Sequence, residues 1–392
     1  MSIDGRKITV LGAGIGGLTA AIALAQRGAR VTVLDQAEKI KEVGAGLQVS
    51  PNGVAVLKAL GLGEKLAEIG VRAEAVALLN GRDGQGVFGL DLMAMEGAGP
   101  YYFVHRADLI AMLHIAAHDA GVTLRLLHQI TKIDLTDDGG AVWQTAQGAK
   151  GNADILIGAD GVRSITRGVL NEPRTPYFTR HVAWRAIVPA RGDEPEVATV
   201  FMGPKRHMVT YPLRGGTQMN IVAVEERTEW TDEGWWHKDD PQNMRAAFAG
   251  FCPDATALLN RVEEVHLWGL FRHPVAERWH RGRVALLGDA VHPTLPFLAQ
   301  GAVMAMEDAW VLADSLANAE DVESGLTRYQ HRRHRRAERV VAAASKNAQN
   351  YHISFPPYRA FAHGLLRATE RFAPGLALKK FDWLYSYDVT KA

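Results

Sequence analysis

The sequence is poor in cysteine: Cys252 is the only one among 392 residues. A single cysteine excludes an internal disulfide and any metal or iron–sulfur site built from cysteine ligands. The chain also lacks an apolar run of about 18 residues and a signal-peptide pattern. A net charge of only +1 provides no overall field that would attract nucleic acid or an anionic membrane. These absences predict a cytoplasmic enzyme that binds neither nucleic acid nor membrane.

Glycine, in contrast, is frequent, and one group of glycines forms a motif. Gly12, Gly14 and Gly17 follow the pattern G-x-G-x-x-G. The motif lies between a predicted strand, 8–11, and residues 15–25, whose apolar positions recur at helical spacing. In such a motif the first glycine permits a tight turn, the second admits a pyrophosphate, and the third allows close helix–strand packing. The helix N-terminus adds N–H groups and the positive end of a dipole.

An acidic residue follows at the place where this motif needs one. A second predicted strand, 31–34, ends at Asp35, where a carboxylate can accept hydrogen bonds from ribose hydroxyls. Strand, helix and acid together predict a dinucleotide-binding βαβ unit, although they do not distinguish FAD from NAD. The same glycine pattern recurs at 84–89, where it leads into no amphipathic helix, and there it predicts a hairpin or loop.

The middle of the chain has a different pattern. After about Pro176, short β-rich runs alternate with glycine, proline and charge, and they predict an antiparallel sheet inserted into the first domain. These runs are 182–189, 198–202, 207–213 and 218–225. A strand at 283–287 then leads to a long helical stretch, 301–348, and the aromatic tail, 374–392, is expected to pack on the body.

Two further motifs each place a carboxylate just after a predicted strand. Residues 154–164 end in a Gly-Ala-Asp-Gly turn that contains Asp160, and residues 283–293 contain a Gly-Asp turn with Asp289. Ligands of open α/β sheets bind at the carboxyl ends of the strands, so both residues are candidate ligands. Taken singly, either could be a capped turn, because Asp before a helix is also a common N-cap.

As a set, the three motifs resemble those of the single-component FAD-dependent aromatic hydroxylases, the para-hydroxybenzoate hydroxylase fold group. The resemblance extends to further segments and covers nearly the whole chain. These segments are 105–109, 184–185, 207–212, 298–302 and 382–388. Within the group, the sequence is most similar to the salicylate hydroxylase branch, alongside the 3-hydroxybenzoate and 6-hydroxynicotinate hydroxylases.

The resemblance implies an α/β fold with three parts. A Rossmann-like FAD-binding domain would comprise residues 1–72, 97–175 and 270–345. An inserted, mainly antiparallel β-sheet substrate domain would comprise 73–96 and 176–269. A C-terminal helical tail would comprise 346–392.

It also implies roles for residues in each cofactor motif. Asp35 would bind the adenosine ribose, although many relatives carry Glu there, and Asp289 would bind the ribityl chain. Asp160 would hold the pyrophosphate region and influence access of NAD(P)H, and Arg106 would contact the flavin.

A helix N-terminus would lie against the flavin itself. The helix that starts near Gly301, Ala302 and Val303 would point its N–H groups at flavin N1 and O2. Reduced flavin carries negative charge there, and a helix N-terminus stabilises an anion by roughly 0.3–2 kcal/mol. Many relatives carry Asn in place of Val303, so here only a backbone contact is expected at that position.

The implied reaction is hydroxylation of a small hydroxylated, carboxylated aromatic or heteroaromatic ring. NAD(P)H would reduce FAD, O₂ would add to form a flavin hydroperoxide, and its terminal oxygen would pass to the ring. The expected partners are the small aromatic substrate and O₂, with the protein a monomer or homodimer. Two alternatives remain open: hydroxylation of a non-benzenoid ring or larger biosynthetic intermediate, and a flavin reductase or sensor without oxygenase activity.

His207 and Tyr211 are the candidate catalytic residues. They lie four apart on a predicted strand, so both point to one face. In the family, the matching histidine faces the ring hydroxyl and the tyrosine lies near it. A phenol has a pKa of about 10, so a base that favours phenolate makes the ring more nucleophilic. The alternative for each is an ordinary sheet residue.

Three other features receive simpler interpretations. His292, next to the Gly-Asp turn, is expected to be structural, and Pro296 favours a salicylate- or hydroxynicotinate-like pocket. The arginine-rich stretch 328–339 is interpreted as the solvated face of a long helix. No histidine or carboxylate cluster in the sequence has the spacing of metal ligands.

Overall fold

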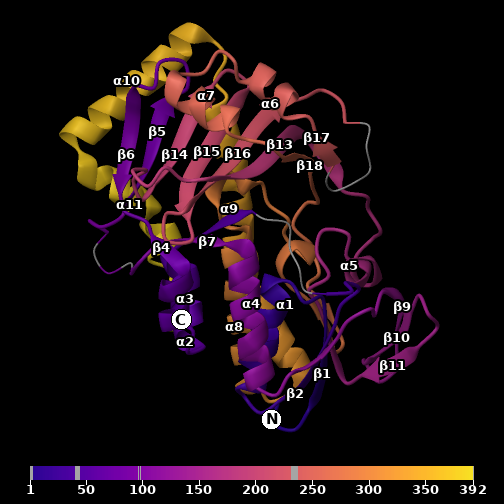
Figure 1. The fold of residues 1–392 in the computed structure, drawn as a ribbon. Helices are drawn as coiled ribbons and strands as arrows, with labels where there is room; N and C mark the ends of the chain where they lie inside the picture. Colours follow the sequence, from indigo (N-terminus) through magenta and orange to yellow (C-terminus); the bar gives the residue numbers. More distant parts are fainter. Residues whose placement is uncertain (1–2, 40–44, 96, 98, 231–236, 392) are drawn as a thin grey trace.

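The computed structural model describes residues 3–39, 45–95, 97, 99–230 and 237–391. Its two main sheets occupy opposite ends of the molecule, with an eight-stranded sheet at the top of Figure 1 and a six-stranded sheet at the bottom. Helices cover both sheets, and the elements between them surround the candidate site. The α/β fold with an inserted antiparallel sheet, expected from the sequence, is confirmed.

The six-stranded sheet has the order β19-β20-β12-β1-β2-β8. All neighbouring strands are parallel except β19 and β20. Its central strands are almost continuously apolar because both faces of the sheet are covered. The strands are β1 (Lys7–Leu11), β2 (Arg30–Leu34), β8 (Thr123–Arg125), β12 (Ile155–Gly158), β19 (His280–Arg281) and β20 (Val284–Leu286).

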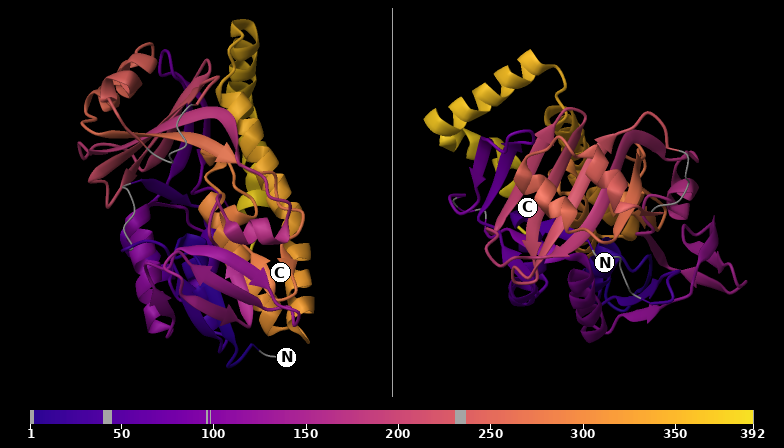
Figure 2. Two further views of the ribbon diagram at one scale, coloured as in Figure 1. Left: turned by 90° about the vertical axis from the view of Figure 1, so that its right-hand side faces the viewer. Right: turned by 45° about the horizontal axis from the view of Figure 1, so that its top comes forward.

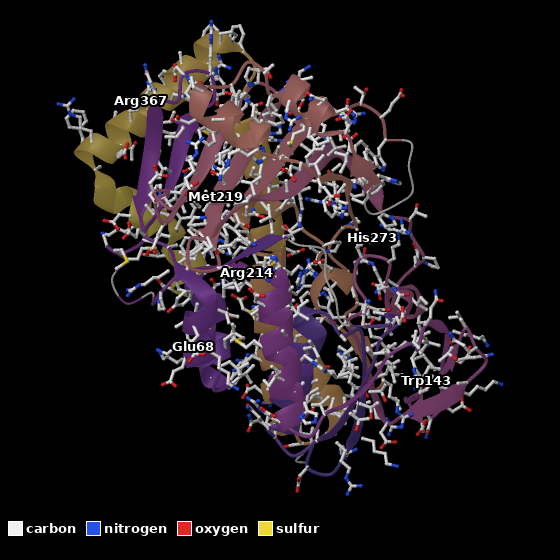
Figure 3. The ribbon with its side chains drawn as sticks, viewed as in Figure 1. Glu68, Trp143, Arg214, Met219, His273 and Arg367 are labelled. Carbon is white, nitrogen blue, oxygen red and sulfur yellow. The ribbon has the colours of Figure 1, made fainter. Side chains whose placement is uncertain are left out.

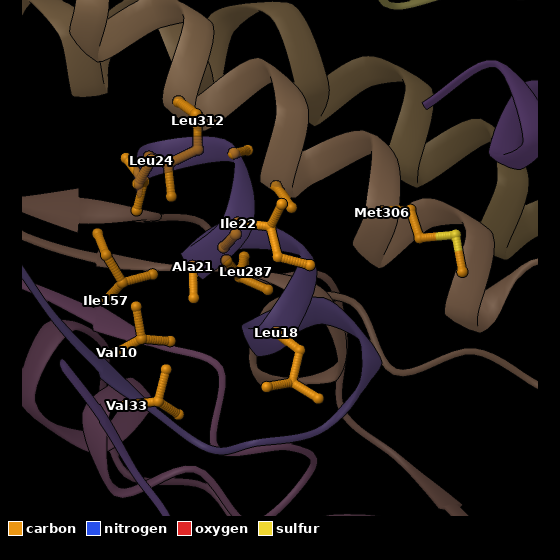
Figure 4. Packing of buried hydrophobic residues seen from close by; sticks show 14 of the residues in the cluster. Val10, Leu18, Ala21, Ile22, Leu24, Val33, Ile157, Leu287, Met306 and Leu312 are labelled. Atoms are coloured by element: carbon orange, nitrogen blue, oxygen red, sulfur yellow. The ribbon is translucent and has the colours of Figure 1, made fainter. Parts of the chain in front are cut away.

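Helix α1 (Ile15–Ala25) is buried between this sheet and the C-terminal helices (Figure 4). Leu18 and Ile22 belong to one core cluster with Val10 of β1 and Leu312 of α8 (Gly301–Ala317). Alanines along α1 permit this close approach, since a larger side chain would need space that the packed interior lacks. The packing fixes the start of α1 against the end of β1, where the glycine motif lies.

The eight-stranded sheet has the order β17-β18-β13-β16-β15-β14-β5-β6, and all its neighbours are antiparallel except β14 and β5. Helices α6 (Pro241–Ala247) and α7 (Pro253–Asn260) cover one face, where Trp184, Met208 and Phe248 are buried. The opposite face is turned toward the candidate site. The strands are β5 (Ala75–Asn80), β6 (Gly86–Asp91), β13 (Tyr177–Pro189), β14 (Val197–Gly203), β15 (Arg206–Leu213), β16 (Gln218–Glu226), β17 (His237–Asp239) and β18 (Val265–Arg272).

Smaller elements complete the body. One three-stranded sheet has the order β3-β7-β4, and another has the order β11-β10-β9. The elements are β3 (Gly46–Val49), β4 (Gly70–Arg72), β7 (Tyr102–His105), β9 (Ile130–Leu135), β10 (Ala141–Thr145), β11 (Lys150–Ala153), α2 (Pro51–Ala59), α3 (Gly63–Ile69), α4 (Arg106–Asp119), α5 (Ile165–Leu170) and the 3₁₀ turns η1 (Gly288–Ala290) and η2 (Pro296–Leu298). The domain boundaries expected from the sequence stay a prediction.

The second glycine pattern lies in a hairpin, as the sequence predicted. Strands β5 and β6 pair antiparallel, and Gly84 adopts a φ of +72° in the turn between them. At this place the glycines therefore belong to a hairpin, and the pattern runs into strand β6 instead of the helix that follows a dinucleotide-binding motif.

The helical stretch expected at 301–348 consists of two helices. Helix α8 ends at Ala317, and α9 (Val322–Tyr351) starts after Asp321, which accepts a hydrogen bond of 2.8 Å from the Ser324 amide. This capping box satisfies the first amides of α9 and fixes its start. Figure 2 shows α9 running along the molecule from the lower layer to the upper one.

The last helices are α10 (Pro356–Phe372) and α11 (Pro374–Tyr385). The expected packing of the tail is confirmed, because Leu384 and Tyr385 are buried against the core. No helix within the described residues is both long and apolar enough to cross a membrane.

The arginine-rich stretch is not simply a solvated face. Arg333 of α9 is fully buried, with Nη1 2.6 Å from Glu307 and Nε 2.8 Å from Asp308. Arg336 donates from Nη2 to Glu307 at 2.7 Å. The solvated interpretation was wrong for these two residues, because α9 packs one face on α8, which supplies two buried carboxylates. The exposed interpretation does describe Arg335.

A bidentate ion pair ties the upper sheet to the lower layer. Arg214, in the turn after β15, lies close to the start of α4 (Figure 3). Its Nε and Nη2 each donate to Asp108 of α4 at 2.8 Å. The pair is partly exposed, so its net contribution is small, but its fork geometry favours one orientation of the two parts.

Candidate functional site

A cavity of about 320 Å³ lies where elements of both main sheets meet. Its walls come from segments far apart in the sequence: the glycine motif, β3, the start of α4, the upper sheet, the Gly-Asp turn and the start of α8. Several residues selected from the sequence line it together. They are Gly14, Arg106, His207, Tyr211, Asp289, Gly301 and Ala302.

The glycine motif meets the cavity through its second glycine. Gly12 has a φ of +103°, and a Cβ there would collide with the carbonyl of Ala159. A Cβ on Gly17 would collide with the carbonyl of Gly12. At Gly14 a Cβ would meet no atom within 4 Å. Gly12 and Gly17 therefore shape the turn, and Gly14 leaves open space that a phosphate group can fill.

Asp35 holds the glycine motif in place. Its Oδ2 accepts a hydrogen bond of 2.6 Å from the Ala13 amide, and its Oδ1 accepts one of 2.8 Å from the Ala37 amide. The side chain is half-buried and does not line the cavity itself. The carboxylate thus connects the end of β2 to the turn after β1.

Asp160 caps the turn that precedes α5. Its carboxylate accepts hydrogen bonds from Ser164 Oγ at 2.5 Å and from the amide and hydroxyl of Thr166 at 3.1 and 3.0 Å. Burial raises the pKa of this carboxyl group, and these hydrogen bonds oppose the rise. Its neighbours Ala159 and Gly161 line the cavity. Asp160 therefore shapes the cavity wall through the backbone of the turn that it stabilises.

Asp289 lies on the cavity wall in η1, the turn that follows β20, and its side chain is exposed there. Desolvation raises the pKa of Asp289, while the charges of His292 and Arg106 oppose the rise. His292 is fully buried, and its Nε2 lies 2.5 Å from Asp308. Asp308 also accepts a hydrogen bond of 3.0 Å from the Gly288 amide. His292 and Asp308 therefore fix the Gly-Asp turn from behind.

The start of α8 faces the cavity at Gly301 and Ala302. The first amides of a helix have no acceptor within the helix, so this end of α8 presents N–H groups and a partial positive charge. Val303 points elsewhere, because its methyl groups pack against Gly53 of α2. Only the backbone of residue 303 is therefore available to a ligand, as the change from Asn implied.

The upper wall of the cavity carries alternate residues of β15. His207, Val209 and Tyr211 line the cavity, whereas Met208 belongs to the core on the opposite face. The same-face arrangement predicted from the spacing of His207 and Tyr211 is present. His207 is 1% exposed, and burial, with the neighbouring charges of His352 and His181, lowers its pKa well below 6.5. Burial raises the pKa of Tyr211, with Arg185 opposing, so Tyr211 stays a neutral phenol.

Two guanidinium groups make the cavity electropositive. Burial and then the charge of Arg185 lower the pKa of Arg106 to about 10, so Arg106 is still a cation at neutral pH. Arg185, on β13, lies over the ring of Trp268 at 5.3 Å, and no carboxylate within the described residues forms an ion pair with it. Two neighbouring cations on the wall of one cavity favour an anionic ligand.

Sequence reasoning missed Arg185, Gln48 and Phe297 as cavity residues. Arg185 was part of a family motif but received no role, although strand alternation beside buried Trp184 places it on the opposite face. Gln48 and Phe297 line both this cavity and an adjoining one of about 100 Å³. Neither lies in a pattern that would have indicated a site, since their positions depend on how distant elements pack.

The chain matches known proteins over almost its full length. The family model described as FAD binding domain matches residues 6–344. A 3-amino-4-hydroxybenzoate 2-monooxygenase of Streptomyces platensis is 34% identical, over 97% of this chain and 96% of that protein. A 3-hydroxybenzoate 6-hydroxylase of Polaromonas naphthalenivorans is 35% identical, again over 97% and 96%.

A solved structure shares the fold and carries the cofactor. Klebsiella pneumoniae HpxO complexed with FAD and uric acid has a TM-score of 0.84 and 27% identity, covering 94% of this chain and 95% of that chain. The open space at Gly14, the N-terminus of α8 and the open carboxylate of Asp289 fit a flavin dinucleotide. The chain therefore belongs to the FAD binding domain family and is an FAD-dependent aromatic-ring hydroxylase, which confirms the resemblance of its three motifs.

Proposed function

We propose that this enzyme hydroxylates a small aromatic or heteroaromatic acid that carries a ring hydroxyl, as salicylate does, with NAD(P)H and O₂ as co-substrates. The observation that carries the proposal is the cavity itself. It joins the glycine motif and the start of α8 to a wall with His207, Tyr211 and Arg185, which forms no ion pair with any residue that the structure describes. The names of the curated relatives, which act on hydroxybenzoates, support the substrate class.

FAD would be held at five places, four of them on the cavity wall. Gly14 would face the pyrophosphate, Asp35 the adenosine ribose, Asp289 the ribityl hydroxyls and Arg106 the flavin, with the amides of 301–303 at its N1 and O2 edge. Asp160 would act near the pyrophosphate through the turn that it caps. When bound, FAD supplies the redox chemistry that passes electrons from NAD(P)H to O₂ and one oxygen atom to the ring.

The side chains of the upper wall would prepare the substrate. His207 would accept the proton of the ring hydroxyl, because a phenolate donates electrons to the ring more strongly than a phenol does. Tyr211, which stays protonated, would donate a hydrogen bond to the same oxygen. The positive charges of Arg106 and Arg185 would stabilise both the phenolate and the carboxylate, and the apolar walls would exclude water.

Replacing Asp289 with alanine is expected to weaken FAD binding by at most a few kcal/mol. The change removes charge-assisted hydrogen bonds to hydroxyl groups but leaves the glycine motif intact. Titration of the apoprotein with FAD measures the dissociation constant. Asp289→Asn, which keeps an acceptor oxygen, should lose less affinity than Asp289→Ala. An unchanged dissociation constant in both variants would show that the Gly-Asp turn has only a structural role.

Replacing Arg185 with methionine is expected to raise the KM of a carboxylated substrate about 10- to 100-fold, the worth of one hydrogen bond to a charged group. FAD content should not change, since Arg185 lies on the upper sheet. A phenol of the same size without the carboxylate serves as the control substrate, and its KM should change much less. Equal losses for both substrates, or loss of FAD, would contradict an anion-binding role.

The proposed reaction is tested by screening hydroxylated aromatic acids for stimulated oxidation of NAD(P)H, with product identified in each positive case. One alternative has a specific observation behind it: the similarity to HpxO bound to uric acid, a non-benzenoid ring. Urate and hydroxylated pyridines therefore belong in the same screen. A protein that oxidised NAD(P)H at one rate with every compound, and formed no hydroxylated product, would be the reductase or sensor alternative.

A further inference from the structure

Behind His207, two further side chains continue a line of hydrogen bonds away from the cavity. His207 Nδ1 lies 2.7 Å from Nε2 of His352, the residue that follows α9. His352 Nδ1 lies 2.9 Å from Oε1 of Glu226, the last residue of β16. The side chain of His352 is 1% exposed and that of Glu226 is 37% exposed. The line therefore runs from the cavity wall, through the protein, to solvent.

We propose that His352 and Glu226 form a proton relay, through which the proton that His207 takes from the substrate hydroxyl reaches solvent. The proposal rests on the function proposed above for His207. It adds two positioning residues, His352 and Glu226, which no motif of the sequence indicates because they come together only in the fold.

The hydrogen bonds set the protonation of each ring. A carboxylate oxygen accepts hydrogen bonds, so the bond to Oε1 of Glu226 places the proton of neutral His352 on Nδ1. Nε2 of His352 is then an acceptor, which places the proton of His207 on its own Nδ1. Nε2 of His207, the remaining nitrogen of a cavity-lining ring, is left as the basic atom. The chain thus orients His207 as a proton acceptor toward the substrate.

The surroundings of the pair explain why a proton would not remain there. Burial lowers the pKa of His207 well below 6.5 and that of His352 to about 4, although Glu226 opposes the second shift. A protonated His207 would be a buried cation beside a second imidazole. If the proton leaves to solvent, the net change is a phenolate beside Arg106 and Arg185, with no cation held on the sheet.

Other titratable groups pack around His207 and His352. The ring of His181 lies 5.5 Å from that of His352, and its Nδ1 is 2.8 Å from the Thr179 carbonyl oxygen. Arg206 lowers the pKa of His352 but is itself paired with Glu225 at 3.2 Å. The rings of Tyr351 and Phe297 pack against that of His207, and burial raises the pKa of Tyr351 to about 12.

The transfer balances as a set of three proton shifts. The O–H bond of the substrate breaks as an N–H bond forms at Nε2 of His207. The Nδ1 proton of His207 passes to Nε2 of His352, and the Nδ1 proton of His352 passes to Glu226 and then to water. No electrons are exchanged. Before the product leaves, one proton returns from solvent along the same line: Glu226 passes it to Nδ1 of His352, the Nε2 proton of His352 passes to Nδ1 of His207, and the Nε2 proton of His207 passes to the product's ring oxygen, which restores both rings.

The relay is tested without turnover, by mixing oxidised holoenzyme with 3-hydroxy-4-nitrobenzoate, whose phenolate is yellow, at a pH below the solution pKa of its hydroxyl. Stopped-flow absorbance then reports how fast the bound phenolate forms. His352→Gln should slow this rate by about tenfold or more, while probe affinity stays within about twofold. Added imidazole should restore part of the rate in His352→Gln. Tyr351→Phe, a neighbouring buried change outside the relay, should keep the wild-type rate.

Each result either supports or overturns the relay. A wild-type rate in His352→Gln overturns the relay, and so does a slow rate that follows lost affinity and does not respond to imidazole. If His352→Gln does not fold, Glu226→Gln gives the test at the surface: its rate should become dependent on buffer concentration, and a rate equal to wild type in all buffers overturns the relay. His207→Ala distinguishes the two proposals, because a wild-type rate in that variant overturns the base role as well.

Discussion

His207→Ala is expected to keep FAD bound and to lower the rate of product formation by about 10²- to 10⁴-fold, the usual contribution of a positioned acid–base group. His207 lies on β15, on the cavity wall opposite the glycine motif, so the cofactor contacts should survive the change. NAD(P)H oxidation should fall much less than hydroxylation, because electrons can still pass to O₂. More of the reducing equivalents should therefore appear as hydrogen peroxide.

The residual activity of His207→Ala should depend more steeply on pH than that of the wild type. Without the base, hydroxylation requires phenolate that forms on its own, and a phenol has a pKa of about 10. The activity of the variant should therefore rise with pH through the range in which the wild type is constant. Product formed per NAD(P)H consumed, measured for both proteins across pH, separates loss of coupling from loss of rate.

The matched control is Met208→Leu. Met208 is the neighbour of His207 and is equally buried, but it packs in the core beneath α6 and α7. Its replacement should leave coupling unchanged. If His207→Ala instead kept the coupling and rate of the wild type at neutral pH, His207 would be a sheet residue without a catalytic role.

Gly14→Val is expected to give a folded protein without FAD. A Cβ on Gly14 meets no protein atom within 4 Å, so the side chain should not disturb the packing of α1. The same side chain would occupy the space that a pyrophosphate needs at the helix N-terminus. The visible absorbance of the purified variant measures its flavin content, and circular dichroism confirms its fold.

The second glycine pattern provides a matched control for Gly14. Gly86 is the second glycine of the motif at 84–89, and a Cβ there also meets nothing within 4 Å. It lies on β6, away from the cavity, so Gly86→Val should keep one FAD per chain. Full flavin retention in Gly14→Val would contradict the assignment of the glycine motif.

The parts of the site that a local pattern encodes could be predicted from the sequence. The glycine turn depends on three residues within one strand–turn–helix unit, and the alternation of β15 places His207 and Tyr211 on one face. The start of α8 at Gly301 agrees with the expected helix start. Such features depend on residues that are close together in the sequence, so one sequence is enough to predict them.

Features that depend on packing between distant elements could not be predicted. Arg333 was interpreted as exposed because a stretch rich in arginine usually faces solvent. Its burial depends on ion pairs with Glu307 and Asp308 of α8, and the sequence does not show that α8 packs against this face of α9. His352 meets His207 across 145 positions of sequence, and neither residue type nor spacing indicates the contact. The sequence allowed Asp160 to be either a ligand or a helix cap. Only the structure shows its hydrogen bonds with Ser164 and Thr166.

The most direct test of the central proposal is incorporation of labelled oxygen into the product of a hydroxylated aromatic acid. With labelled O₂, unlabelled water and NAD(P)H, mass spectrometry should find one labelled oxygen atom per product molecule, and one NAD(P)H should be consumed for each product formed. Product that carries oxygen from water, or NAD(P)H oxidation that yields only hydrogen peroxide with every aromatic acid tested, would contradict the proposed monooxygenase reaction.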